Sequence, residues 1–192
     1  MATHYRQKLA GLLLAGLAWL CLPHGVSADD SYFTIRTADV QLVEGVYLLD
    51  ATIDFRFSDA AMEALQNGIP LVLEVEIRVE RGRKWLWDDT VATLSQRYRL
   101  QFHALSDRYV VHNLNTDERE SFSMLDDALY VLGEIRAFPM LDRRLLMAGS
   151  DYLAGIRASL VVEELPTPMR LWAYVSDQWH MNSPWYTWPL QP

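Results

Sequence analysis

The stretch IPLVLEVEIRV, residues 69–79, decides the fold. Its residues alternate between apolar side chains and mostly charged ones such as Glu74, Glu76 and Arg78. The apolar face consists of Ile69, Leu71, Leu73, Val75, Ile77 and Val79. A period of two with one apolar and one charged face predicts a half-buried strand of an antiparallel sheet.

The same alternation recurs along the chain. A turn signal at Glu44 and Gly45 predicts that residues 33–43 and 47–57 pair as a hairpin. Three more segments have strand character: 98–104, 109–114 and 152–162. At least six strands are therefore expected.

Short helices are predicted between these strands. Ser58 is expected to cap a helix over residues 59–67, which Gly68 ends. Ser123 is expected to cap a second helix over residues 124–134, and Pro168 suits the start of a third. Long β-α-β repeats are absent. The fold class expected is therefore mainly β: an antiparallel β-sandwich, immunoglobulin-like or a related curved sheet, with two or three short helices. An α+β fold is the alternative.

Residues 1–28 are typical of a secretory signal peptide. Arg6 and Lys8 precede an uncharged apolar run over residues 9–22, and cleavage is expected after Ala28. An uncleaved membrane anchor is the alternative interpretation. Residues 29–192 are then expected to form a single β-rich domain in the periplasm, with a Trp-rich C-terminal wrap and no membrane-spanning segment.

Cleavage changes the charge and the cysteine count. The mature chain would keep 15 basic and 25 acidic residues, a net charge of −10, compared with −8 for the whole chain. Such an acidic balance argues against nucleic-acid binding. The one cysteine, Cys21, lies in the signal, so disulfides and thiol catalysis are not expected in the mature domain.

Catalytic motifs are scarce. The chain has no G-x-S-x-G turn and no Gly-rich phosphate loop. We therefore expect no enzyme activity and no cofactor. His103 and His112 could meet across a hairpin, with Asp107 or Glu118 as a third ligand for a metal-assisted hydrolase, but two exposed strand histidines are the simpler interpretation and no metal site is expected.

Tryptophan is the more unusual feature. Two tryptophans follow a basic cluster in residues 83–88, and four more lie in the last 21 residues. They could form an aromatic surface for sugars, muropeptides or a partner protein, or the tail residues could plug the open end of the sandwich. The candidate binding residues are Trp85, Trp87, Trp185, Trp188, Arg83 and Lys84.

Four segments carry a resemblance to a known family: residues 64–71, 83–88, 165–168 and 183–190. In combination they resemble domain of unknown function 4390, a family of small exported proteobacterial proteins without an assigned activity. Genes of that family tend to lie beside an rRNA methyltransferase gene and a sensor kinase pair. The resemblance implies an envelope protein with a sensory link, and it supplies no catalytic residues.

Together these features favour a non-enzymatic periplasmic interaction module. Its expected partner is an envelope protein, for which the sensor kinase is a candidate. Binding of a glycan or muropeptide on aromatic rings is the alternative, and a metal-assisted hydrolase is the third hypothesis.

Overall fold

The computed structural model describes residues 31–82 and 89–191. The expected signal peptide, residues 1–28, and four of the candidate binding residues, in the segment 83–88, lie outside this part of the chain. The strands within it are β1 (Phe33–Val43), β2 (Val46–Phe55), β3 (Leu71–Arg81), β4 (Asp89–His103), β5 (Arg108–Asn113), β6 (Arg119–Phe122), β7 (Glu134–Asp142), β8 (Tyr152–Leu160) and β9 (Tyr186–Leu190). The helices are α2 (Asp59–Gln66), α3 (Leu125–Gly133) and α4 (Thr167–Ala173), with short 3₁₀ turns η1 (Arg143–Leu145), η2 (Val162–Glu164) and η3 (Asp177–Trp179).

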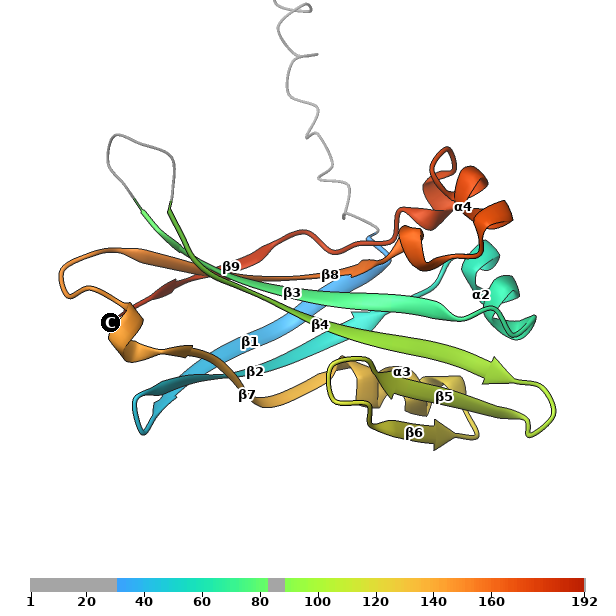
Figure 1. Ribbon diagram of the computed structural model, residues 1–192, viewed down its shortest axis with the longest axis horizontal. Coiled ribbons are helices and arrows are strands. Elements are labelled where there is room, and N and C mark those ends of the chain that lie inside the picture. Colours follow the sequence, from blue (N-terminus) through green and yellow to red (C-terminus); the bar gives the residue numbers. More distant parts are fainter. Residues whose placement is uncertain (1–30, 83–88, 192) are drawn as a thin grey trace, which may run out of the picture. The chain divides into compact units, whose positions relative to one another are not determined.

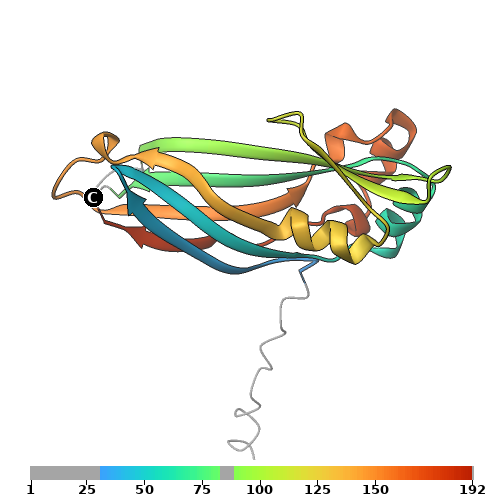
Figure 2. The same cartoon turned by 90° about the horizontal axis from the view of Figure 1, so that it is seen from below.

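These strands form two antiparallel sheets. The first has the order β1-β2-β7 and the second the order β6-β5-β4-β3-β8-β9. Figure 1 shows β3, β4 and β8 crossing over β1 and β2, and Figure 2 shows the two layers from another side. The prediction of a mainly antiparallel β-sandwich with few helices is confirmed.

The alternation in β3 explains how the layers pack. Leu71, Leu73, Val75, Ile77 and Val79 are completely buried and belong to one hydrophobic core that also receives β1, β2 and β8. Their neighbours Glu74, Glu76, Arg78 and Glu80 point to the other, outer face of the six-stranded sheet. The sandwich thus leaves the outer face of β3 charged and partly exposed from Glu74 to Glu80, whereas Val72 on the same face is buried.

The predicted hairpin and the first helix are confirmed. Strands β1 and β2 pair around Glu44 and Gly45, both of which have positive φ angles, 50° and 85°. The Ser58 hydroxyl accepts a hydrogen bond from the backbone N–H of Ala61 and so caps α2. This matches the pattern from which the helix was predicted.

The prediction for α3 was wrong at its first residue. Met124 is the N-cap in extended backbone, and no side chain caps the helix. Ser123 lies one residue too early for that role, because the helix begins at Leu125. The acidic residues Asp126 and Asp127 occupy the first turn as expected, where the helix dipole favours them.

Three strands, β6, β7 and β9, lie where no strand was predicted. Strand β7 follows α3 directly and pairs with β2, with two shifts of register. Strand β9 comes from the segment expected to be a wrap, and it pairs with β8 at the edge of the six-stranded sheet. The chain just before it also runs along β8, because Leu160 donates to the Met181 carbonyl and Ser183 donates to the Ala158 carbonyl.

Candidate functional site

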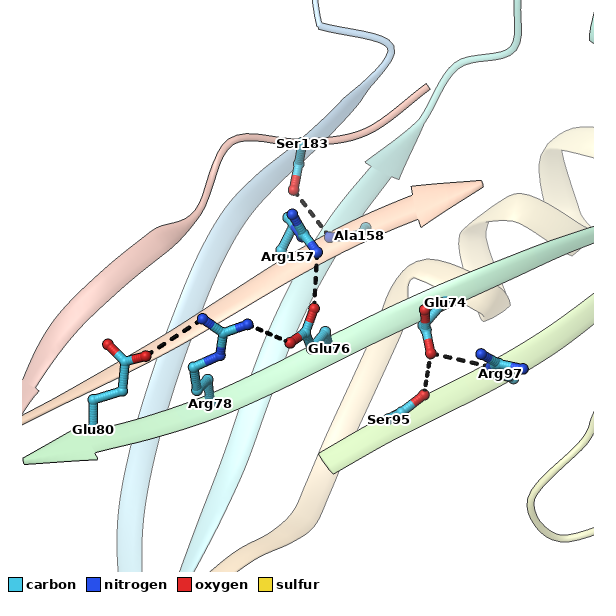
Figure 3. Close-up of polar contacts among 9 residues, drawn as sticks. All are labelled: Glu74, Glu76, Arg78, Glu80, Ser95, Arg97, Arg157, Ala158 and Ser183. Carbon is cyan, nitrogen blue, oxygen red and sulfur yellow. Dashed lines mark hydrogen bonds and ion pairs between the residues drawn. The ribbon is translucent and has the colours of Figure 1, made fainter. Parts of the chain in front are cut away.

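The outer face of β3 and β8 carries a network of opposite charges (Figure 3). Glu76 is at its centre. One carboxylate oxygen of Glu76 accepts from Arg78 at 2.7 Å, and the other accepts from Arg157 of β8 at 2.9 Å. Arg78 also reaches Glu80 at 3.4 Å. Antiparallel pairing of Glu76 with Arg157 brings these residues together, although they are 81 positions apart.

Trp185 lies on top of this network. The guanidinium carbons of Arg78 and Arg157 lie 4.7 Å and 4.9 Å from the centre of its ring. Both distances are within the range of a cation–π interaction. Gly155 makes room for the ring, because a Cβ atom there would lie only 3.1 Å from Trp185 Cε3. A glycine inside a strand is typical of such close approaches.

The position of Trp185 follows from how the tail runs. Ser183 is buried, and its hydroxyl accepts from the Ala158 N–H at 3.0 Å. Pro184 follows, and β9 then begins at Tyr186, opposite Ile156. Trp185 therefore lies between two segments that are each fixed to β8. The backbone on either side of Trp185, at Ser183 and at Tyr186, is attached to β8, and this limits the positions that the indole ring can take.

Glu74, the next outward-facing residue of β3, is bonded to Ser95 and Arg97 of β4. Partial burial of Glu74 by itself raises the pKa of its carboxyl group, but hydrogen bonds from Ser95 and Arg97 outweigh that effect and lower the pKa below its ordinary value of 4.5. The hydrogen bond to Glu76 raises the pKa of Arg78. Both groups are therefore charged at neutral pH, and this part of the face is neutralised internally.

A hollow of about 270 Å³ opens beside Trp185. Arg78, Glu80, Leu153, Gly155 and Thr187 line it together with the indole ring. In addition, Nε of Arg157 is buried and has no hydrogen-bond partner among the described residues. The hollow thus has an aromatic wall, a positive charge at Arg78 and a negative charge at Glu80. The Nε–H group of Arg157, which lacks a hydrogen-bond partner among the described residues, lies close by.

Trp188 lies at a different place. It lines a groove of about 470 Å³ between β1 and the end of β9, together with Tyr47, Asp39 and Arg143. Its indole N–H is buried without a partner in the described part of the chain, and its ring lies 6.2 Å from that of Tyr186. Trp185 and Trp188 therefore belong to two separate sites.

The other tail tryptophans divide between core and surface. Trp179 is 7% exposed and belongs to the core, as expected for a plug at the end of the sandwich. Trp172 of α4 is 73% exposed, so it does not plug the sandwich. The remaining candidates, Trp85, Trp87, Arg83 and Lys84, lie outside the described residues.

His103 and His112 line one hollow on the outer face of β4 and β5. His112 pairs with Arg99, whereas His103 pairs with Arg108, so the two are four residues apart along the ladder, about 13 Å. Within residues 31–82 and 89–191, no group of three His, Cys, Asp or Glu side chains could hold a metal ion. Arg99 and Arg119, which line the same hollow, also disfavour a cation there.

Sequence reasoning did not select Arg78, Arg157, Glu76 and Gly155. Alternation placed Glu76, Arg78 and Arg157 on polar strand faces, but it gave no sign that β3 and β8 are neighbours. Gly155 was the available signal, because it interrupts the strand pattern of residues 152–162 at a position where another group approaches closely.

Comparisons with known proteins add a family match. A family model described as Domain of unknown function (DUF4390) matches residues 30–189. The comparison with curated proteins found no match, and neither did the comparison with solved structures. Among the described residues, no helix combines the length and the apolar character needed to cross a membrane.

Proposed function

Since the chain belongs to the family of domain of unknown function 4390, whose description assigns no activity, we propose a function from its geometry. The protein is a non-enzymatic binding module of the periplasm. It contacts another envelope protein through the outer face of β3, β8 and β9, with Trp185 at the centre of the contact. The extracytoplasmic part of a membrane sensor kinase is the first partner to test.

The observation that carries this proposal is the ring of Trp185 held over two arginines. Tryptophan and arginine are the residues most enriched among those that dominate binding energy at protein interfaces. Arg78 and Arg157 are already fixed by Glu76, at 2.7 Å and 2.9 Å. A surface whose side chains are already ordered loses little entropy when a partner binds.

The residues that line the hollow indicate which side chains a partner would insert into it. Leu153 is 44% exposed at its rim and offers apolar area, while Arg78 and Glu80 present opposite charges. A partner that inserts one apolar side chain flanked by a hydrogen-bonding or charged group fits this lining. Charges at the rim would set orientation and the association rate more than affinity.

Site-specific photo-crosslinking in the native envelope tests the proposal. A photoreactive residue at Thr187, which lines the hollow, should capture an envelope protein, and Trp185→Ala should abolish the adduct. The same photoreactive residue at Gln66, which is exposed on α2, is the matched control and should give no such adduct. Equal adducts at Thr187 and Gln66, or none at Thr187, would contradict the proposal.

Localisation has its own test. We expect the protein in the periplasmic fraction, with Asp29 as its first residue. Retention in the cytoplasm, or a chain that still carries residues 1–28, would contradict this part of the proposal.

Glycan or muropeptide binding is the second candidate, and the groove at Trp188 favours it. An aromatic wall, the opposite charges of Asp39 and Arg143, and an unpaired indole N–H suit a ligand with hydroxyl and charged groups. Tryptophan fluorescence titrated with muropeptides should change in the wild type. Trp188→Phe keeps an aromatic ring but removes the N–H and part of the ring area, so it should weaken binding, while Trp172→Phe should not. The absence of any change in the wild type would exclude this candidate.

A further inference from the structure

The far end of the same sheet carries a row of basic side chains. In the ladder, Arg99 of β4 pairs with His112 of β5, and His112 pairs with Arg119 of β6. Gln101 and His103 follow on the same face of β4. All five line one hollow of about 290 Å³, which we name the basic hollow.

Positive charge in the basic hollow is only partly neutralised. Asp117 is bonded to His112 at 2.6 Å and to Arg119 at 3.3 Å. These two contacts, that to His112 first, lower the pKa of Asp117. Among the described residues, Arg99 and His103 have no carboxylate partner, and the nearby Glu118 instead accepts from Thr116. Arg99 therefore carries a positive charge that no carboxylate in the described part of the chain neutralises.

The rest of the outer face does not share this excess. Arg97, two residues before Arg99, is bonded to Glu74, and Arg78 and Arg157 are bonded to Glu76. Among the described residues of β3, β4 and β8 on this face, the uncompensated charge therefore lies at the end where β4 pairs with β5 and β6. It stands out because the whole chain carries a net charge of −8.

The donors of the basic hollow indicate the ligand. Arginine offers a planar fork of N–H groups that suits oxyanions, and imidazole and amide groups add single donors. A phosphate group has enough acceptor oxygens to bind two arginines and an imidazole together. The volume is at the lower end for ligand pockets, so it suits a phosphate ester rather than a large molecule.

We propose that the basic hollow of Arg99, Gln101, His103, His112 and Arg119 binds a phosphate group of a soluble ester or of a lipid headgroup. Arg99 is the principal contact, because it is half-buried and lacks a carboxylate partner in the described part of the chain. This proposal is independent of the partner contact at Trp185, which lies on other strands of the sheet.

Solution NMR of the histidine side chains tests the proposal. Inorganic phosphate, compared with sodium chloride at equal ionic strength, should shift the ring signals of His112, which pairs with Arg99, more than those of His103, about 13 Å further along the ladder. Arg99→Gln should weaken phosphate binding by about tenfold, because a charge-assisted hydrogen bond is lost. Arg36→Gln is the matched control: Arg36 is also a strand arginine, but it is paired with Asp54 outside the hollow, so affinity should not change. Circular dichroism confirms that both variants are folded.

Vesicles distinguish the two sources of phosphate. Phosphatidic acid in phosphatidylcholine vesicles should bind the wild type more than Arg99→Gln if the ligand is a lipid headgroup, even where free phosphate produces no shift. Shifts with free phosphate and no vesicle binding would indicate a soluble ester. The proposal is overturned if neither probe binds, or if Arg99→Gln and Arg36→Gln behave alike.

Discussion

Replacing Trp185 with alanine should lower the free energy of unfolding, and the size of the loss can be estimated from the contacts and the burial of the ring. Two guanidinium contacts at 4.7 Å and 4.9 Å contribute about 0.5–1 kcal/mol each at a partly exposed site. A half-buried indole ring removes on the order of 100 Å² from water, which adds roughly 2.5 kcal/mol. Area estimates are upper bounds, so the expected loss of unfolding free energy is about 3–4 kcal/mol.

A double-mutant cycle separates the ring–arginine contacts from the loss of area. Urea unfolding is measured for Trp185→Ala, for Arg78→Met or Arg157→Met, and for each pair. Coupling energies of about 0.5–1 kcal/mol are expected for both arginines. Arg97→Met is the control, because Arg97 lies on the same face but is bonded to Glu74 and does not contact the ring. Its coupling with Trp185 should be close to zero.

Two results would refute this reasoning. Coupling no larger for Arg78 and Arg157 than for Arg97 would mean that the ring does not lie over the guanidinium groups in solution. A total cost of Trp185→Ala below about 1 kcal/mol, the typical effect of a point mutation, would mean that the ring is free of the sheet. Either result would remove the ordered surface on which the proposed protein contact depends.

Three further predictions concern other parts of the fold. Glu74→Gln should lower stability at neutral pH. Because the folded-state pKa of Glu74 lies below 4.5, the difference from wild type in urea unfolding should shrink as pH falls from that value through the folded pKa. Ser183→Ala should cost about 1–3 kcal/mol in thermal or urea unfolding, because the buried N–H of Ala158 loses the hydroxyl that accepts from it. Gly133→Ala should cost about 1–3 kcal/mol, since its Cβ would overlap a backbone carbonyl of β2, whereas Gly82→Ala, with ordinary contacts only, should be nearly neutral.

Much of the fold could be predicted because alternation is a local signal. The strand at residues 69–79 and the hairpin around Gly45 each follow from neighbouring residues, and so does the cap at Ser58. Strand β7 could not be found this way. Its register with β2 shifts twice, Ala137 has a positive φ of 46°, and Pro139 interrupts the pattern. Bulges break the period of two on which the prediction depends.

The candidate site was harder to predict because it depends on pairing between distant strands. Trp185 was selected from the tail, yet its ring position requires Gly155 and Arg157 of β8 and Arg78 of β3. Only the register of β3 with β8 brings these residues together. Strand β9 also contains Pro189, which is tolerated because β9 lies at the edge of its sheet.

The outer face of the six-stranded sheet therefore carries two regions with different charge balance. Arg78 pairs with Thr93 in the ladder, and Arg99 lies six residues further along β4, about 20 Å away. That distance exceeds the screening length of about 8 Å at physiological salt, and the pair of Glu74 and Arg97 lies between the regions. Charge changes at one region should hardly affect the other. If the phosphate proposal fails, the proposed protein contact at Trp185 is therefore not affected. If the protein contact fails instead, Arg99 in the basic hollow still lacks a carboxylate partner among the described residues, so the phosphate proposal keeps its basis.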